Sequence, residues 1–292
     1  MIGRRPPRAL GLVVTSSLVF LYAPLVVAIF FAFNKGGNLS FPFKGFSLRW
    51  FRQVFGDPEF TEPLKTSAMV SLVTAALAVA IGTAASLAFV RHRRRTLRVV
   101  EGASRLPAML PPLLIGASML TAIAAFGFGL SSRTVVAGQL VYVIPFVLVV
   151  ITARASGIPR ELEEAARDLG ASPSETFRRI QLPLLAPAIV GATILAFAFS
   201  FDEVLITTWT VGNSPTLPIF LVSRMRREID PSINAVATVL LVIPWIALAI
   251  GFLVEARSIG RLGGAMRGRA KAALGADEDG ATIARASSGS GL

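Results

Sequence analysis

Six apolar segments alternate with polar ones along the chain, and each has about the length of a helix that crosses a membrane. They cover about residues 10–33, 64–90, 106–126, 134–152, 188–211 and 233–254. A helix needs roughly 20 apolar residues to cross about 30 Å of hydrocarbon. The pattern therefore predicts an all-α membrane protein with six transmembrane helices, formed by residues 10–256.

Small residues and prolines set two of these predicted spans apart. In the second span, Ala78 and Gly82 lie about one helical turn apart, which lets another helix approach closely. In the third span, Pro107, Pro111 and Pro112 each lack a backbone N–H, so we expect its first part to be irregular.

The polar segments predict what lies outside the membrane. Residues 1–9 precede an apolar run that is long and has no Ala-x-Ala cleavage pattern, so we interpret that run as an uncleaved span. Residues 34–63 are polar and aromatic, which predicts an outer loop with a short helix near Trp50 at the membrane surface. Residues 257–292 are basic and then rich in Gly, Ala and Ser, so we expect a mostly disordered tail.

The distribution of basic residues predicts the topology. If residues 1–9 and 257–292 both lie in the cytoplasm, the inner segments hold 20 of the 29 Lys and Arg residues. Membrane proteins carry such an excess on the cytoplasmic side. We therefore expect a multi-pass protein of a bacterial inner membrane, whose net charge of +12 lies in loops and does not indicate a nucleic-acid partner.

Few residues could support covalent chemistry or bind a metal. The chain has no cysteine, one histidine (His92) and no sequence of the form GxxxxGK[ST]. Thiolate and histidine metal sites, a phosphate-binding loop and an evident catalytic cluster are all missing. We therefore expect neither an enzyme nor a cofactor on this chain, so ATP-driven transport would require a separate ATPase.

The loop over residues 157–187 is a polar island between the predicted fourth and fifth spans. Pro159 and Gly170 favour a helix over Pro159–Leu169, and Ser172 with Glu175 forms a capping box that starts a second helix. The pairs Leu182-Pro183 and Ala186-Pro187 should close that helix. The first helix carries an apolar ridge that is too small to form a core alone: Leu162, Ala165, Ala166 and Leu169.

Glu164-Ala165-Ala166, then Gly170, and later Leu182-Pro183 resemble the cytoplasmic coupling loop of permease subunits of binding-protein-dependent ABC importers. The resemblance implies a type I ABC importer permease fold and a loop that inserts into a groove of an ATPase subunit carrying ATP and Mg. An ordinary amphipathic helix pair is the alternative. The residues to which the resemblance assigns coupling are Glu161, Glu164, Ala165, Ala166, Gly170, Leu182 and Pro183.

The predicted fifth span contains two adjacent acidic residues, Asp202 and Glu203. Carboxylates within a membrane span are costly and usually face a cavity or a partner. On a continuous helix, Ser200, Glu203 and Thr207 would share one face. We expect at least one acidic face to line a translocation path for a cation, with a structural ion pair or a helix break as the alternative.

Residues 200–241 resemble the spermidine/putrescine branch of these permeases. The resemblance implies a second permease subunit, in a heterodimer by expectation, together with two ATPase subunits and an extracytoplasmic binding protein. That protein would dock near Arg224, Arg226 and Arg227, unless these arginines only contact lipid headgroups. Two other functions stay open: an ion-gradient-driven secondary transporter and an ABC importer of a different substrate.

Overall fold

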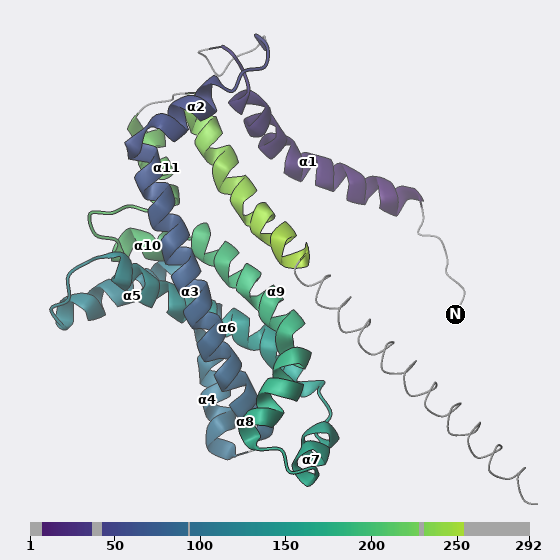
Figure 1. Ribbon diagram of the computed structural model, residues 1–292. Helices are drawn as coiled ribbons and strands as arrows, with labels where there is room; N and C mark the ends of the chain where they lie inside the picture. Colours follow the sequence, from purple (N-terminus) through teal and green to yellow (C-terminus); the bar gives the residue numbers. More distant parts are fainter. Residues whose placement is uncertain (1–7, 37–42, 93, 228–230, 254–292) are drawn as a thin grey trace, which may run out of the picture. The chain divides into compact units, whose positions relative to one another are not determined.

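The computed structural model describes residues 8–36, 43–92, 94–227 and 231–253, and these residues form helices joined by short loops (Figure 1). Five helices are long and apolar enough to cross a membrane, and a bent helix pair makes a sixth if it counts as one span. Within the described residues, the prediction of an all-α membrane protein is confirmed, with five apolar spans and a bent sixth apolar segment. Residues 1–7 and the predicted tail 257–292 lie outside them.

The bounds of the helices in the described part are as follows. The first half contains α1 (Arg8–Ala32), α2 (Arg49–Gly56), α3 (Pro58–Arg91), α4 (Arg95–Arg105), the 3₁₀ turn η1 (Leu106–Met109) and α5 (Pro112–Ala125). The second half contains α6 (Ser132–Ser156), α7 (Glu161–Asp168), α8 (Pro173–Thr176), the π-helical turn η2 (Phe177–Gln181), α9 (Leu182–Phe201), α10 (Leu205–Thr210), α11 (Leu217–Arg227) and a last helix, Ser232–Leu253.

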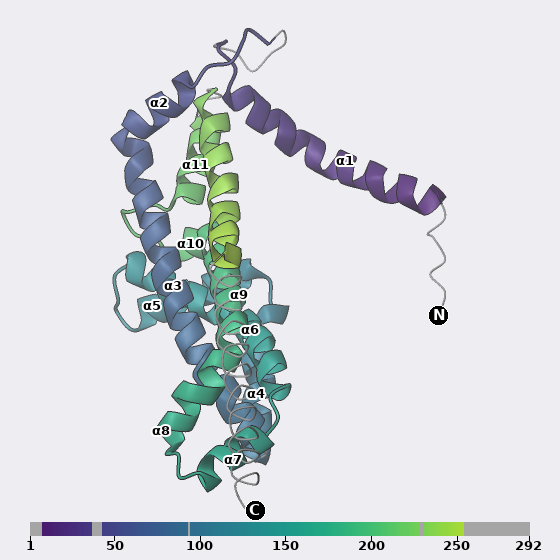
Figure 2. The same ribbon diagram turned by 45° about the vertical axis from the view of Figure 1, so that its right-hand side comes forward.

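Helices α3, α6 and α9 lie side by side and form the main core (Figures 1 and 2). Their facing side chains are small or branched and include Ala78, Val147 and Leu185, all fully buried. A Cβ atom on Gly82 of α3 would lie 2.5 Å from Cγ1 of Val147, so only glycine allows α3 and α6 to approach so closely. The close helix contact predicted at Ala78 and Gly82 is confirmed.

A second buried cluster joins α2 to the first turns of α3, to α11 and to the last helix. The indole N–H of Trp50 donates to the carbonyl of Asn34 at 2.8 Å, and Val54 is buried one turn later. The short helix predicted near Trp50 therefore exists, with one face packed on the protein. Phe55, by contrast, is 52% exposed.

The third apolar segment is bent more strongly than its prolines led us to expect. The α4–η1 segment and α5 meet at 108° at Leu110 and Pro111. Pro111 adopts an extended conformation and Pro112 starts α5, because neither proline can donate the backbone hydrogen bond that would continue a helix. A single span over about 106–126 is therefore too simple a description.

The helix of the fifth apolar segment differs from the predicted span, about residues 188–211, at both ends. The helix does not close at Pro183 and Pro187 but runs on from η2 into α9, and it stops at Phe201 rather than near 211. Proline clashes with the carbonyl four residues earlier, and the wider π turn just before Pro183 displaces the carbonyls there. Beyond Phe201 the chain breaks at residues 202–204 and restarts as α10.

Candidate functional site

The loop between α6 and α9, residues 157–181, has the helix, the glycine turn and the capping box that the sequence predicts, although α7 begins at Glu161 and Pro159 precedes it. Gly170 has a φ of +83°, a left-handed conformation that ends α7. Its N–H donates to the Arg167 carbonyl at 2.8 Å. The backbone N–H of Ser172 donates to Glu175 at 2.9 Å and the Glu175 N–H donates to Ser172 Oγ at 3.3 Å, so the capping box is confirmed. We call this segment the α7–α8 loop.

The apolar ridge of the α7–α8 loop is largely exposed. Leu169 at the end of α7 is 89% exposed and Leu162 is 43% exposed, whereas Ala166 is buried. The loop therefore presents apolar surface that the described part of the chain does not cover. Glu161, Glu164, Ala165 and Gly170 are exposed beside these leucines, whereas Leu182 and Pro183 lie at the start of α9.

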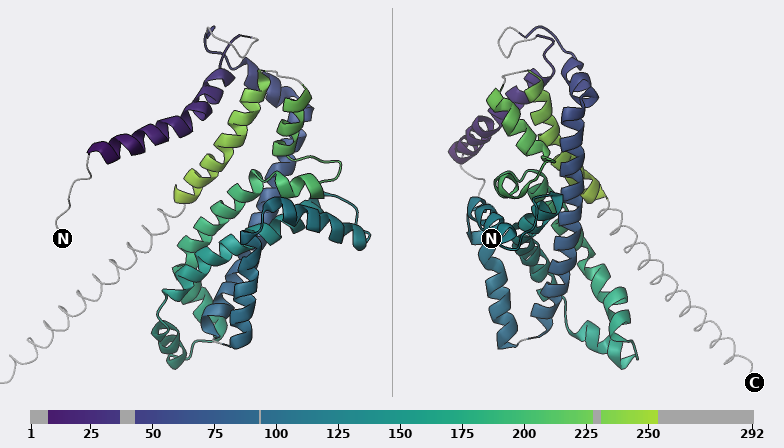
Figure 3. Two further views of the ribbon diagram at one scale, coloured as in Figure 1. Left: turned by 180° about the vertical axis from the view of Figure 1, so that it is seen from behind. Right: turned by 90° about the vertical axis from the view of Figure 1, so that its left-hand side faces the viewer.

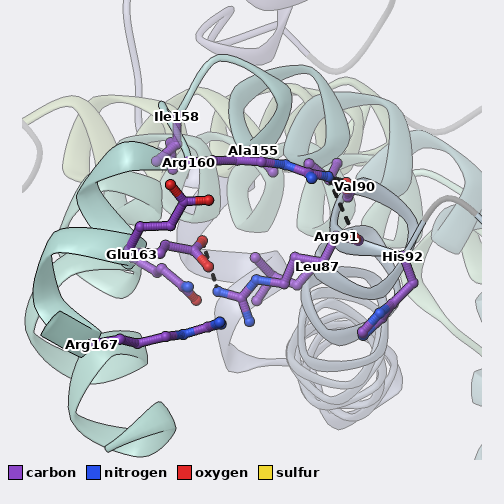
Figure 4. Close-up of a pocket in the computed structure, with 11 residues that line it drawn as sticks. Leu87, Val90, Arg91, His92, Ala155, Ile158, Arg160, Glu163 and Arg167 are labelled. Atoms are coloured by element: carbon purple, nitrogen blue, oxygen red, sulfur yellow. Dashed lines mark hydrogen bonds and ion pairs between the residues drawn. The ribbon is translucent and has the colours of Figure 1, made fainter. Parts of the chain in front are cut away.

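Polar contacts fasten α7 to the end of α3, and sequence reasoning did not find them. Arg91 Nη2 lies 3.0 Å from Glu163 Oε1, and Arg160 Nη2 donates to the Val90 carbonyl at 3.0 Å. Figure 4 shows these side chains around a cavity of about 270 Å³ that also reaches Gln181. His92 lines this cavity with its side chain exposed, as part of the end of α3.

Glu203 occupies the break between α9 and α10, with its carboxylate turned toward α10. Its two oxygens accept hydrogen bonds from the backbone N–H groups of Ile206 at 2.7 Å and Thr207 at 2.8 Å, and from Thr207 Oγ1 at 2.7 Å. These N–H groups start α10 and have no partner within that helix. Glu203 is 7% exposed, so its carboxylate satisfies buried donors at the break.

Gln139 of α6 is a buried residue that the sequence analysis did not select. Its amide donates to Thr207 Oγ1 at 3.0 Å and to the Ser200 carbonyl at 3.3 Å, and it accepts from the Ser200 hydroxyl. The Thr74 hydroxyl of α3 donates to Gln139 Oε1 at 3.4 Å. Ser200, Glu203 and Thr207 are thus brought together, but through Gln139 and the helix break rather than along one continuous helical face.

Asp202 behaves differently from its neighbour. Its side chain is exposed and lines a cavity of about 460 Å³ together with Tyr142, Trp245 and Phe199. A carboxylate among aromatic rings suits a cation, since the faces of the rings attract positive charge. Glu203 lines the same cavity, but it is buried and its carboxylate is held by the N–H groups of α10, so the pair consists of an exposed carboxylate and a buried, hydrogen-bonded one.

The three arginines of α11 also differ in their surroundings. Arg224 lies 3.5 Å from Glu59 and 3.9 Å from Asp57 at the start of α3, and its guanidinium is 5.7 Å from the Phe220 ring. Arg226 and Arg227 are exposed. All three arginines, which the sequence analysis assigned to docking of a binding protein, lie on one helix, α11.

The bundle of apolar helices, with its exposed helix pair and an acidic break in one span, is a multi-pass membrane transport component. The chain belongs to the family of binding-protein-dependent transport system inner membrane components, which matches residues 76–259.

Curated relatives in this family carry the names of polyamine permeases. The chain is 28% identical over 240 residues to the spermidine/putrescine transport system permease protein PotC of Haemophilus influenzae, covering 82% of this chain and 93% of that protein. It is 31% identical over 232 residues to the putrescine transport system permease protein PotI of Escherichia coli, with coverage of 76% and 82%. The resemblance to the spermidine/putrescine permease branch is confirmed.

Solved structures of ABC importers have the same fold. A bacterial importer of the acidic polysaccharide alginate matches with a TM-score of 0.67 at 13% identity, over 86% of this chain and 94% of the other. The MetNI methionine transporter in an inward-facing conformation matches with a TM-score of 0.58 at 16% identity, over 73% and 99%. The type I ABC importer permease fold is therefore confirmed, and at these identities the likeness concerns the fold alone.

Proposed function

We propose that this chain is the membrane-spanning subunit of an ATP-driven importer of polyamines or a related small organic cation. The observation that carries the substrate class is the cavity at the α9–α10 break, where the exposed carboxylate of Asp202 lies beside Tyr142 and Trp245. A protonated amine gains both a charge partner and aromatic faces there. The names of the curated relatives point to the same class of substrate.

The importer would consist of this chain, a second permease, two ATPase subunits and an extracytoplasmic binding protein, in a bacterial inner membrane. The exposed Leu169 and Glu164 fit a docking surface for an ATPase that carries ATP and Mg. Both termini and the α7–α8 loop would then lie in the cytoplasm. Membership of a binding-protein-dependent family does not favour a secondary transporter driven by an ion gradient.

The proposed mechanism is alternating access driven by the ATPase. Closure of the ATPase dimer on ATP would displace the two α7–α8 loops, and the packed helices would turn as rigid bodies to open the path outward. Asp202, in the break at residues 202–204, would line the path. Arg226 and Arg227, exposed at the end of α11, remain candidates for contact with the binding protein.

The test is uptake of radiolabelled putrescine into liposomes that contain the purified complex. We expect uptake that requires both the binding protein and internal ATP and that persists when ion gradients are collapsed. Replacing Glu164 by lysine should leave ATP hydrolysis in place but uncouple it from uptake, because the exposed charge on the docking surface is reversed. Uptake that continues with a catalytically dead ATPase would overturn the proposal. ATP-dependent uptake of a different solute, with putrescine excluded, would overturn the substrate class alone.

A further inference from the structure

The α7–α8 loop is connected through the backbone to α6 and α9, but not to α3. Residues 157–160 link it to α6, and η2 continues directly into α9. Helix α3 belongs to the same three-helix core, yet the chain leaves it for α4 before it returns. Any displacement of the loop must therefore reach α3 through noncovalent contacts.

A cavity interrupts the packing at the end of α3 that faces the loop. In the middle of the bundle, Gly82 brings α3 into close contact with α6. Toward the loop, a cavity of about 270 Å³ lies among Leu87, Ala155 and Gln181. Gln181 lines this cavity and is 2% exposed, and its buried Oε1 atom accepts no hydrogen bond from the described residues. Close packing transmits displacement, and an open space of this size interrupts it.

Polar contacts cross this gap from α7 to α3. The Arg91 and Glu163 side chains are 33% and 18% exposed and lie 3.0 Å apart, which shields their ion pair from much of the solvent. Arg160, which is exposed, donates to the carbonyls of Val90 and Arg91 at 3.0 and 3.4 Å. The last carbonyls of a helix lack partners within the helix and carry partial negative charge, so a guanidinium binds well there.

We propose that Glu163, Arg91 and Arg160 form a clamp that makes α3 move with the α7–α8 loop. These are positioning residues, which neither bind substrate nor take part in ATP hydrolysis. The inference rests on the proposed function, because it concerns how the loop passes the motion of an ATPase to the membrane helices. Without the clamp, α6 and α9 would follow the loop while the end of α3 lagged behind.

A charge swap tests the clamp in the complete transporter. Glu163→Arg and Arg91→Glu should each lower putrescine uptake per ATP hydrolysed by roughly fivefold or more. The double variant that exchanges the two residues should recover most of that loss, which a merely disruptive change would not do. Arg98→Glu, the same charge reversal as Arg91→Glu at an exposed residue of α4 outside the α7–α8 loop, is the matched control and should leave the ratio unchanged. Co-purification of the ATPase with each variant is measured alongside.

A second measurement observes the clamp without relying on transport. The chain has no cysteine, so spin labels on Ala84→Cys and Asp168→Cys report the distance between α3 and α7 alone. In the conservative variant Glu163→Gln, the distribution of that distance should broaden or shift. An unchanged distribution, or single variants with a normal uptake ratio, would overturn the clamp. The clamp would also be overturned if the double variant folded and bound the ATPase but its uptake per ATP hydrolysed stayed as low as in the single variants. Failure of wild-type uptake to depend on ATP would instead overturn the proposed function.

Discussion

Replacing Leu169 by alanine tests whether the tip of the α7–α8 loop binds the ATPase. Leu169 is 89% exposed, the largest exposed fraction among the large apolar side chains in the described part of the chain. It contributes almost nothing to the permease core, so the substitution should leave thermal unfolding of the permease unchanged. Its apolar surface is instead available for burial by a partner.

The expected size of the effect follows from that exposed fraction. Complete burial of a leucine side chain contributes about 1.5–3 kcal/mol, and alanine keeps only the first carbon of the side chain. With 89% of the surface still available, the substitution should weaken ATPase binding by about 1.5–2.5 kcal/mol. That corresponds to roughly a 10- to 60-fold increase in Kd.

The assay is surface plasmon resonance of the nucleotide-free ATPase subunit on permease pairs held in nanodiscs. Leu48→Ala makes the same substitution at a residue that is 54% exposed in the predicted outer loop, and it should not change the Kd. If Leu169→Ala binds within twofold of the unaltered chain, or if Leu48→Ala weakens binding equally, the loop tip is not the docking surface.

Further substitutions test the membrane region. Gly82→Val would place a Cβ 2.5 Å from a side-chain carbon of α6 and should lower the free energy of unfolding by about 1–3 kcal/mol. Gly191→Val is the control, because a Cβ there would meet no atom within 4 Å, and it should lower the unfolding temperature less in the same thermal scan. Asp202→Asn should raise the KM for putrescine uptake without altering thermal stability, and an unchanged KM would remove Asp202 from the path. Glu203→Gln should instead destabilise the protein by about 1–3 kcal/mol, because an amide cannot accept from all of the donors at the break; normal stability would contradict a structural role. Gln139→Leu should likewise lower the unfolding temperature, because the buried hydroxyls of Ser200 and Thr74 lose the acceptor that Gln139 provides.

Features governed by nearby residues could be predicted from the sequence almost to the residue. Gly170 ends α7 in a left-handed conformation and Ser172 caps α8, because both depend only on hydrogen bonds across three to five residues. Apolar runs likewise predict helices that cross a membrane. Proline was a less reliable signal: Pro112 starts a helix after a sharp bend, whereas Pro183 lies within a continuous one.

Contacts between distant segments could not be predicted in the same way. Gln139 contacts residues more than 60 positions away in the sequence, and Arg91 contacts Glu163 over 72 positions. Neither residue belongs to a recognisable motif, and an amide in an apolar run or an arginine in a basic cluster has many possible partners. Only the arrangement of α3, α6 and α9 brings them together.

The acidic pair illustrates how a helix break changes the meaning of a sequence pattern. On a continuous helix, adjacent residues differ by about 100° in direction, and both carboxylates could be assigned to a path through the membrane. The chain instead stops at Phe201, so Asp202 remains at the end of α9 beside a cavity while Glu203 turns to the N–H groups of α10. The break at residues 202–204 thus supplies both an exposed carboxylate, on Asp202, and the carboxylate of Glu203 that caps α10. A variant that neutralises both residues would combine a loss of attraction for a cation with a loss of structure, and only the single variants can separate them.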